Sequence, residues 1–166
     1  MTTPDVYADY IKSLIDAEVA RKSSLEQRGA GVITASSALA TLLFALVGVV
    51  TAAKNFVLPT SAHGYLIVAV GLFAAAVALG VLANVPFLYK QANPTAKTLA
   101  EVWHYDEPHA QLYIVATQLR VLGSARRSNA LKGWLVLIAG LTQVAALVVL
   151  VLGVVAILSA NPHPVN

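Results

Sequence analysis

Hydrophobic and polar positions divide the chain into long apolar intervals separated by charged segments. Three intervals contain no Asp, Glu, Lys or Arg: 29–53, 55–89 and 133–166, of 25, 35 and 34 residues. A helix needs about 20 apolar residues to cross the roughly 30 Å of hydrocarbon in a bilayer. The pattern therefore predicts an all-α membrane protein with three transmembrane helices, one per interval: 30–53, 65–89 and 133–158.

The charged segments between these spans predict amphipathic helices. In the first, 4–28, apolar residues recur at helical spacing: Val6, Tyr7, Tyr10, Ile11, Leu14 and Ile15. The insert 90–132 predicts two helices, 94–105 and 108–130, and the second carries its own apolar stripe: Leu112, Val115, Ala116, Leu119 and Leu122. Each stripe needs apolar cover, so we expect the two to pack on each other. Neither 21–53 nor 120–158 contains proline. The helix 4–28 can therefore continue into the first span and the helix 108–130 into the third, with Gly29 and Gly123 as candidate bends.

The distribution of basic residues predicts the orientation in the membrane. The segments before the first span and between the second and third hold ten Lys or Arg, whereas the short turn 54–64 holds one and the tail none. Basic residues accumulate on the cytoplasmic side. We therefore expect a cytoplasmic N-terminus and an external C-terminus in the inner cell membrane.

Composition excludes several classes of protein. The chain is 58% apolar and 11% charged, against about 45–50% and about 25% for a soluble domain. This composition argues against a soluble domain, a disordered tail and a nucleic-acid-binding module. Without cysteine there is no disulfide, thiol nucleophile or thiolate metal ligand. The whole chain, 1–166, is predicted to form one helical membrane domain.

One polar group invites a metal interpretation: His104, Asp106, Glu107 and His109. The two histidines are five residues apart, off a single helical face, and Pro108 interrupts any helix between them. Zinc sites usually pair ligands at i and i+4 or add cysteines. A capped, solvated turn is the favoured interpretation, and no cofactor is expected.

The spans contain no ionisable side chain, whereas proton relays and coupled transporters normally place one there. We therefore expect no enzyme. Small and amide residues recur instead, and seven are predicted to mediate helix association: Thr34, Thr41, Ala45, Gly48, Gly80, Asn84 and Gln143. Such residues let helices approach closely or share hydrogen bonds. Packing within one chain and an oligomeric seam or pore lining both remain open.

Six residues are predicted to anchor the chain at the interface: Arg28, Lys90, Arg126, Arg127, Lys132 and Trp134. Long basic side chains reach towards headgroups and an indole suits the interface. The basic anchors also make anionic lipid headgroups a candidate partner.

The layout around the first span carries a resemblance. Acidic Glu18 and the basic pair Arg21–Lys22 precede a small-residue-rich span, which is followed by a second span and a long helical insert. This arrangement resembles the small membrane effectors of bacterial anti-phage systems, namely SLATT-type proteins and the transmembrane effectors of Pycsar systems. It differs in lacking an appended cyclic-nucleotide-binding domain. The resemblance implies sensing of a signal, self-association and membrane damage. The alternative is an accessory or scaffold subunit of a larger membrane complex.

The predicted topology can be tested with reporters. A reporter active only in the cytoplasm should be silent when fused after Asn166 and active when inserted near Pro94, because ten basic residues against one set the orientation. The reverse pattern at both sites would overturn it.

Overall fold

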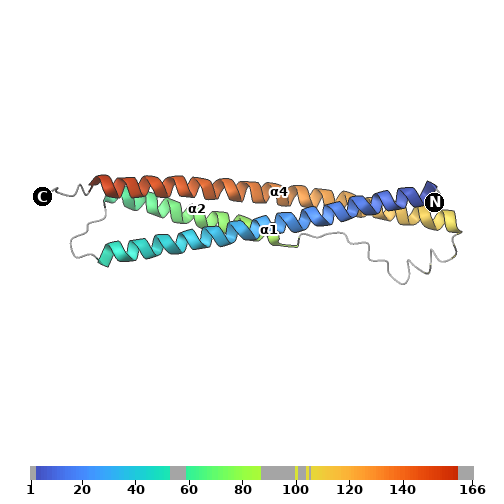
Figure 1. Cartoon of the computed structure of the whole chain (residues 1–166), viewed down its shortest axis with the longest axis horizontal. Helices are drawn as coiled ribbons and strands as arrows, with labels where there is room; N and C mark the ends of the chain where they lie inside the picture. The colour runs from blue at the N-terminus through green and yellow to red at the C-terminus, as the bar shows by residue number, and fades with distance from the viewer. Residues whose placement is uncertain (1–2, 53–58, 87–99, 101–103, 105, 161–166) are drawn as a thin grey trace. The chain divides into compact units, whose positions relative to one another are not determined.

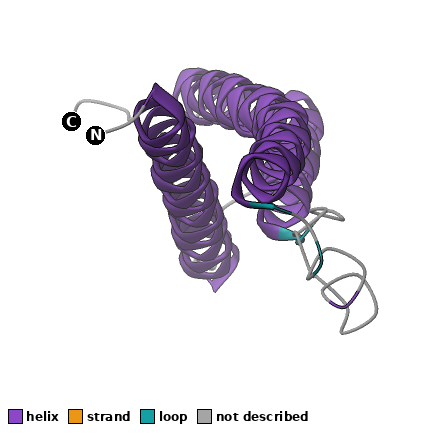
Figure 2. Cartoon of the chain, turned by 90° about the vertical axis from the view of Figure 1, so that its right-hand side faces the viewer, coloured by secondary structure: helices purple, strands orange, loops and turns teal. Residues whose placement is uncertain are grey.

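The described part of the chain consists of three long helices. The computed structural model describes residues 3–52, 59–86, 100, 104 and 106–160. The helices are α1 (Thr3–Ala52), α2 (Thr60–Asn84) and α4 (Glu107–Ala160) (Figure 1). No strand occurs among these described residues (Figure 2). Each helix is long and apolar enough to cross a membrane, so the all-helical class with three candidate spans is confirmed.

Two of the helices are much longer than a span. α1 has 50 residues and α4 has 54, which at 1.5 Å per residue corresponds to about 75–80 Å. The predicted helix 4–28 therefore joins the first span, and the predicted helix 108–130 joins the third. Both helices pass through Gly29 and Gly123 without interruption. Each helix is therefore much longer than the roughly 30 Å that a helix needs to cross the hydrocarbon of a bilayer.

The second span differs from the predicted 65–89. α2 begins at Thr60 and ends at Asn84. The Pro59 carbonyl accepts a hydrogen bond from the His63 amide at 3.2 Å, which places the first helical turn earlier than predicted. Pro86 disfavours the helical conformation at the residue before it, so the helix ends sooner. The expected continuation through 87–89 lies outside the described residues.

The insert between the second and third spans is described only in part. Most of the predicted helix 94–105 lies outside the described residues. The break predicted at Asp106–Pro108 is the N-terminus of α4. There the Asp106 carbonyl accepts from the Ala110 amide at 3.0 Å, and the Asp106 carboxylate contacts His109 Nδ1. This exposed cap fits the predicted solvated turn.

The chain divides into two compact units, which are described separately. Unit 1 comprises residues 1–25 and 85–133, and unit 2 comprises residues 26–84 and 134–166. In unit 1 the two helices run parallel, because Glu18 bonds Asn129 and a methyl group on Gly133 would lie 4.0 Å from Leu25 Cδ2. With the exception of Leu14, the buried and half-buried residues described on this part of α1 recur at alternating steps of three and four: Ala8, Ile11, Ile15, Glu18, Lys22 and Leu25. On α4 a line of the same spacing contains every fully buried residue described on this part of the helix; its members are Val115, Gln118, Leu122, Ala125, Asn129 and Lys132.

We call these two facing lines of residues on α1 and α4 the seam. Its residues differ from those expected to pack on the basis of the apolar stripes. Ile11 and Leu122 are buried as expected, but Tyr7 and Tyr10 are 63% and 61% exposed, and Leu112 and Leu119 are exposed as well. A repeat of three and four residues averages 3.5 residues, so it selects a narrow line on each helix. Tyr7 and Tyr10 lie off that line, so they are exposed although their rings are apolar.

Unit 2 contains the apolar parts of α1 and α4 together with α2. α2 runs antiparallel to α1, because Gly29 approaches Gly80 while Leu43 packs with Leu66. Every buried residue described on α2 follows steps of four and three: Ala62, Leu66, Ala69, Phe73, Ala76, Gly80 and Ala83. Five of these seven are Ala or Gly, and small residues allow close approach of helices in lipid.

The close contact of α1 with α2 predicts the effect of adding one methyl group. Gly80→Ala would place its Cβ 2.8 Å from Ile33 Cγ1 and 3.1 Å from the Gly29 carbonyl oxygen. We expect it to lower the free energy of unfolding in detergent by about 1–3 kcal/mol. Gly71→Ala is the control, because nothing lies within 4 Å of its new Cβ. It should be neutral or stabilising by up to about 1 kcal/mol. Equal stabilities of the two variants would contradict the described contact.

Candidate functional site: helix contacts and a buried polar cluster

The seven predicted association residues separate into two groups. Thr34, Thr41, Ala45 and Gly48 are exposed. Three others lie in the packed part of unit 2, where Gly80 is buried and Asn84 and Gln143 are half-buried. Among the residues that the structure describes, burial between helices is therefore seen for the second group. Whether either group contacts a second molecule stays a prediction.

Gly80 and Asn84 belong to a close crossing of α1 and α2. Asn84 Nδ2 donates a hydrogen bond to the Gly80 carbonyl at 3.0 Å. A methyl group on Gly29 would lie 3.0 Å from Asn84 Nδ2 and 3.4 Å from that same carbonyl oxygen. Gly29 was expected only as a bend, whereas the structure makes it a contact residue. Its position two heptads after Ile15 is the sequence signal for this role.

Ser36 is a buried polar residue of α1 that the sequence analysis missed. Its side chain is 0% exposed, and its Oγ has no hydrogen-bond partner within the described part of the chain. It lies seven residues after Gly29 and seven before Leu43, both of which contact α2. It is therefore level with Phe73, midway between the Gly29–Gly80 and Leu43–Leu66 contacts. An unpaired buried hydroxyl costs about 1–3 kcal/mol, so Ser36 weakens the contact of α1 with α2 at this level.

Gln143 on α4 lies within about one helical turn of this level. A methyl group on Gly153 would lie 3.7 Å from Leu66 Cδ2, and α2 is antiparallel to α4. Ten residues back from Gly153 and ten on from Leu66 are Gln143 and Ala76. The level of Gln143 is therefore three residues along α2, about one helical turn, from the level of the buried hydroxyl of Ser36.

The densest polar contacts lie in unit 1, around Glu18. Asn129 Nδ2 donates to Glu18 Oε2 and to the Glu18 carbonyl oxygen, both at 2.8 Å. Arg126 Nε and Arg21 Nη1 lie 3.7 and 3.9 Å from Glu18 Oε1. Asn129 is 1% exposed, so the bonds are shielded from water. We call Glu18, Asn129, Arg126 and Arg21 the polar cluster; it joins α1 to α4.

Lys132 extends this polar region along the seam. It was predicted as an interface anchor, yet it is 1% exposed because it lies three residues after Asn129 on the same line of α4. A side chain buried against the protein does not present its ammonium group to lipid headgroups. Arg28, Arg127 and Trp134 are exposed, as anchors require, while Lys90 lies outside the described residues.

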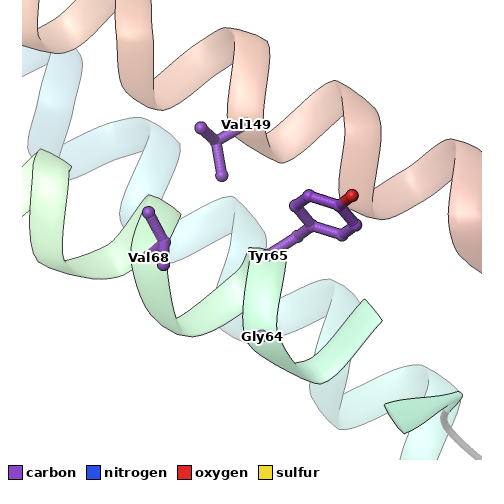
Figure 3. Close-up of a pocket in the computed structure, with 4 residues that line it drawn as sticks. All are labelled: Gly64, Tyr65, Val68 and Val149. Carbon is purple, nitrogen blue, oxygen red and sulfur yellow. The ribbon is translucent and has the colours of Figure 1, made fainter. Parts of the chain in front are cut away.

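An open apolar groove of about 460 Å³ lies between α2 and α4. Its lining comprises Gly64, Tyr65 and Val68 of α2 and Val149 of α4 (Figure 3). Apart from the Tyr65 hydroxyl, no side chain of this lining carries a polar group. The groove offers hydrocarbon contact and no hydrogen-bonding pattern for a specific polar ligand.

No metal-binding group of three His, Cys, Asp or Glu occurs among the residues described. His104 and His109 are both exposed. No family model, curated protein or solved structure matches the chain. The contacts between its own helices therefore carry the functional argument.

The polar cluster predicts a selective loss of stability. Glu18→Ala removes the carboxylate acceptor of Asn129, and we expect the free energy of unfolding in detergent to fall by about 1–3 kcal/mol. Asp16→Ala removes an exposed carboxylate from the same helix and should change it by less than about 0.5 kcal/mol. Equal effects in thermal unfolding would show that the Glu18 contacts contribute nothing.

Proposed function

We propose that the chain is a non-enzymatic multi-pass protein of the inner cell membrane that self-associates through α1. In this proposal, a signal received by its cytoplasmic helices causes the assembly to permeabilise the bilayer. The proposed orientation, with the N-terminus inside, rests on the ten-to-one asymmetry of basic residues. The antiparallel direction of α2 relative to α1 and α4 fits three successive crossings.

The observation that carries self-association is an uncharged face of α1. Thirteen exposed residues at alternating steps of four and three have no charge: Val6, Tyr10, Ser13, Ala17, Ala20, Ser24, Gln27, Gly31, Thr34, Ala38, Thr41, Ala45 and Gly48. Nine of the first 28 residues are charged, and none of those nine falls on this line. Most members are Ser, Ala, Gly or Thr. We call it the outer face of α1, because the seam lies on a different line of the helix.

The outer face favours a second copy as its partner. Between residues 6 and 27 it lies before the charge-free interval, where acyl chains do not cover a helix. A heptad of small uncharged residues allows two helices to pack closely. Two copies inserted with the same orientation have parallel α1 helices, so the same face can meet itself about a twofold axis. A homo-oligomer built on α1 would therefore cover a face that is exposed in the part of the chain that the structure describes.

The permeabilising activity rests on two further considerations. The charge-free spans offer no relay for coupled transport, so damage through helix association needs less chemistry than catalysis does. The layout around Glu18, Arg21 and Lys22 resembles anti-phage membrane effectors, for which signal-dependent membrane damage is the implied activity. Exposed Arg28, Arg126 and Arg127 also suit anionic headgroups at about 1 kcal/mol each.

Substitutions on the outer face test the proposal. Ala45→Leu and Ala20→Leu enlarge two of its residues and should weaken association by about 1–3 kcal/mol, roughly ten- to a hundredfold. The measurement is the mass of the purified protein in detergent, with membrane potential after induced expression as the second readout. Ala75→Leu, on an exposed position of α2, is the matched control and should leave both readouts unchanged.

The outcomes separate the alternatives. An unchanged mass in all three variants would remove the outer face as the contact. If the wild-type protein oligomerises but leaves potential and growth untouched, the effector function is abandoned. A monomer that co-purifies with another membrane protein would favour the accessory subunit.

A further inference from the structure

Apolar residues make up most of the seam between α1 and α4 in unit 1, including Ile11 and Ile15 on α1 and Leu122 and Ala125 on α4. Outside the polar cluster, the polar residues of the seam are Lys22, Gln118 and Lys132. If α4 slides along α1 by seven residues, about 10 Å, its seam residues again lie opposite the seam residues of α1. Residues of similar size then replace one another, so apolar burial alone discriminates weakly between these registers.

The polar cluster distinguishes the native register strongly from the registers shifted by seven residues. Asn129 Nδ2 reaches both the carboxylate and the main-chain carbonyl of Glu18 at 2.8 Å. A slide of seven residues in one direction would bring Leu122 opposite Glu18, and the slide in the other direction would bring Val136 there. In both cases the Asn129 amide, which is 1% exposed, loses both of its acceptors on Glu18. The Glu18 carboxylate loses Asn129 and Arg126 and keeps only Arg21 of its own helix. A buried polar residue at a seam position is known to specify register in coiled coils, at a cost in stability.

We propose that Glu18 and Asn129 form a register lock between α1 and α4. The lock excludes the heptad-shifted pairings that the apolar residues of the seam permit, and it acts just before both helices enter their charge-free intervals. Its contribution is to the choice of pairing more than to stability, because buried polar pairs can be replaced by apolar residues without loss of stability. This inference stands without the proposed function, since it concerns pairing within one chain.

The absence of cysteine makes the register directly measurable in the full-length protein. Seven residues before the lock on each helix are Ile11 and Leu122, both buried in the seam. Ile11→Cys with Leu122→Cys reports the native register. Val115 lies seven residues before Leu122, so Ile11→Cys with Val115→Cys reports a slide of one heptad. Both pairs are introduced into protein in native membranes and oxidised.

With the lock intact, we expect the Ile11–Leu122 crosslink and little of the Ile11–Val115 crosslink. The double substitution Glu18→Leu with Asn129→Leu should reduce the Ile11–Leu122 crosslink. The Ile11–Val115 crosslink should appear if α4 slides towards the C-terminal end of α1. Asp16→Leu with Arg127→Leu, two exposed charges on the same helices, is the control and should keep the native pattern. Thermal unfolding of the lock variant should be equal to or higher than that of the parent.

Two results would overturn the lock. An undiminished native crosslink in the Glu18→Leu, Asn129→Leu protein would show that the remaining seam fixes the register. A large fall in unfolding temperature without any change in crosslinking would show that the pair contributes only stability. Neither result bears on oligomer mass or membrane potential, so failure of the lock and failure of the proposed function are distinguishable.

Discussion

The structure depends on one constraint, the narrowness of the line that each helix buries. On α1, α2 and α4 alike the buried positions recur at steps of three and four, and most of them in unit 2 are Ala or Gly. Between helices in lipid there is little hydrophobic driving force, so stability comes from close van der Waals contact along such a line. This is why an added methyl group on Gly80 would come within 2.8 Å of Ile33 Cγ1 and one on Gly29 within 3.0 Å of Asn84 Nδ2. It is also why an unpaired buried hydroxyl, that of Ser36, weakens the contact of α1 with α2.

Much of the fold was predictable because it follows from charge and length. Intervals without charge gave three helices of spanning length, and runs without proline allowed α1 and α4 to continue through their boundaries. The first and last residues of α2 were harder to predict, because the charge-free interval 55–89 is longer than the helix inside it. Pro59 and Pro86 set those limits, and their effect on the neighbouring backbone was underweighted against hydropathy.

The candidate site was harder to predict, for a physical reason. A list of small residues does not say which face of a helix meets its neighbour, since Ala and Gly occur on both the seam and the outer face of α1. Apolar residues mislead similarly: Tyr10 is exposed while polar Asn129 is buried. The distinguishing signal was the phase of the three-four spacing, which places Asn129 and Lys132 on the same line as Ala139 and Ala146. Read across all three helices, that phase would have identified Gly29 and Ser36 as well.

The same spacing has a geometric consequence for α1. A straight α-helix drifts by about 20° for every seven residues relative to a repeat of 3.5. Within unit 1 the seam of α1 runs from Ala8 to Leu25, 17 residues, so on a straight helix its direction would turn by about 50°. A repeat of this period keeps its line against a neighbouring helix when the two helices wind left-handed about each other, and the uncharged outer face, which has the same period, then winds with it. In the proposed assembly, two copies therefore have to match in superhelical pitch as well as in residues, which makes the curvature of α1 itself a determinant of partner choice.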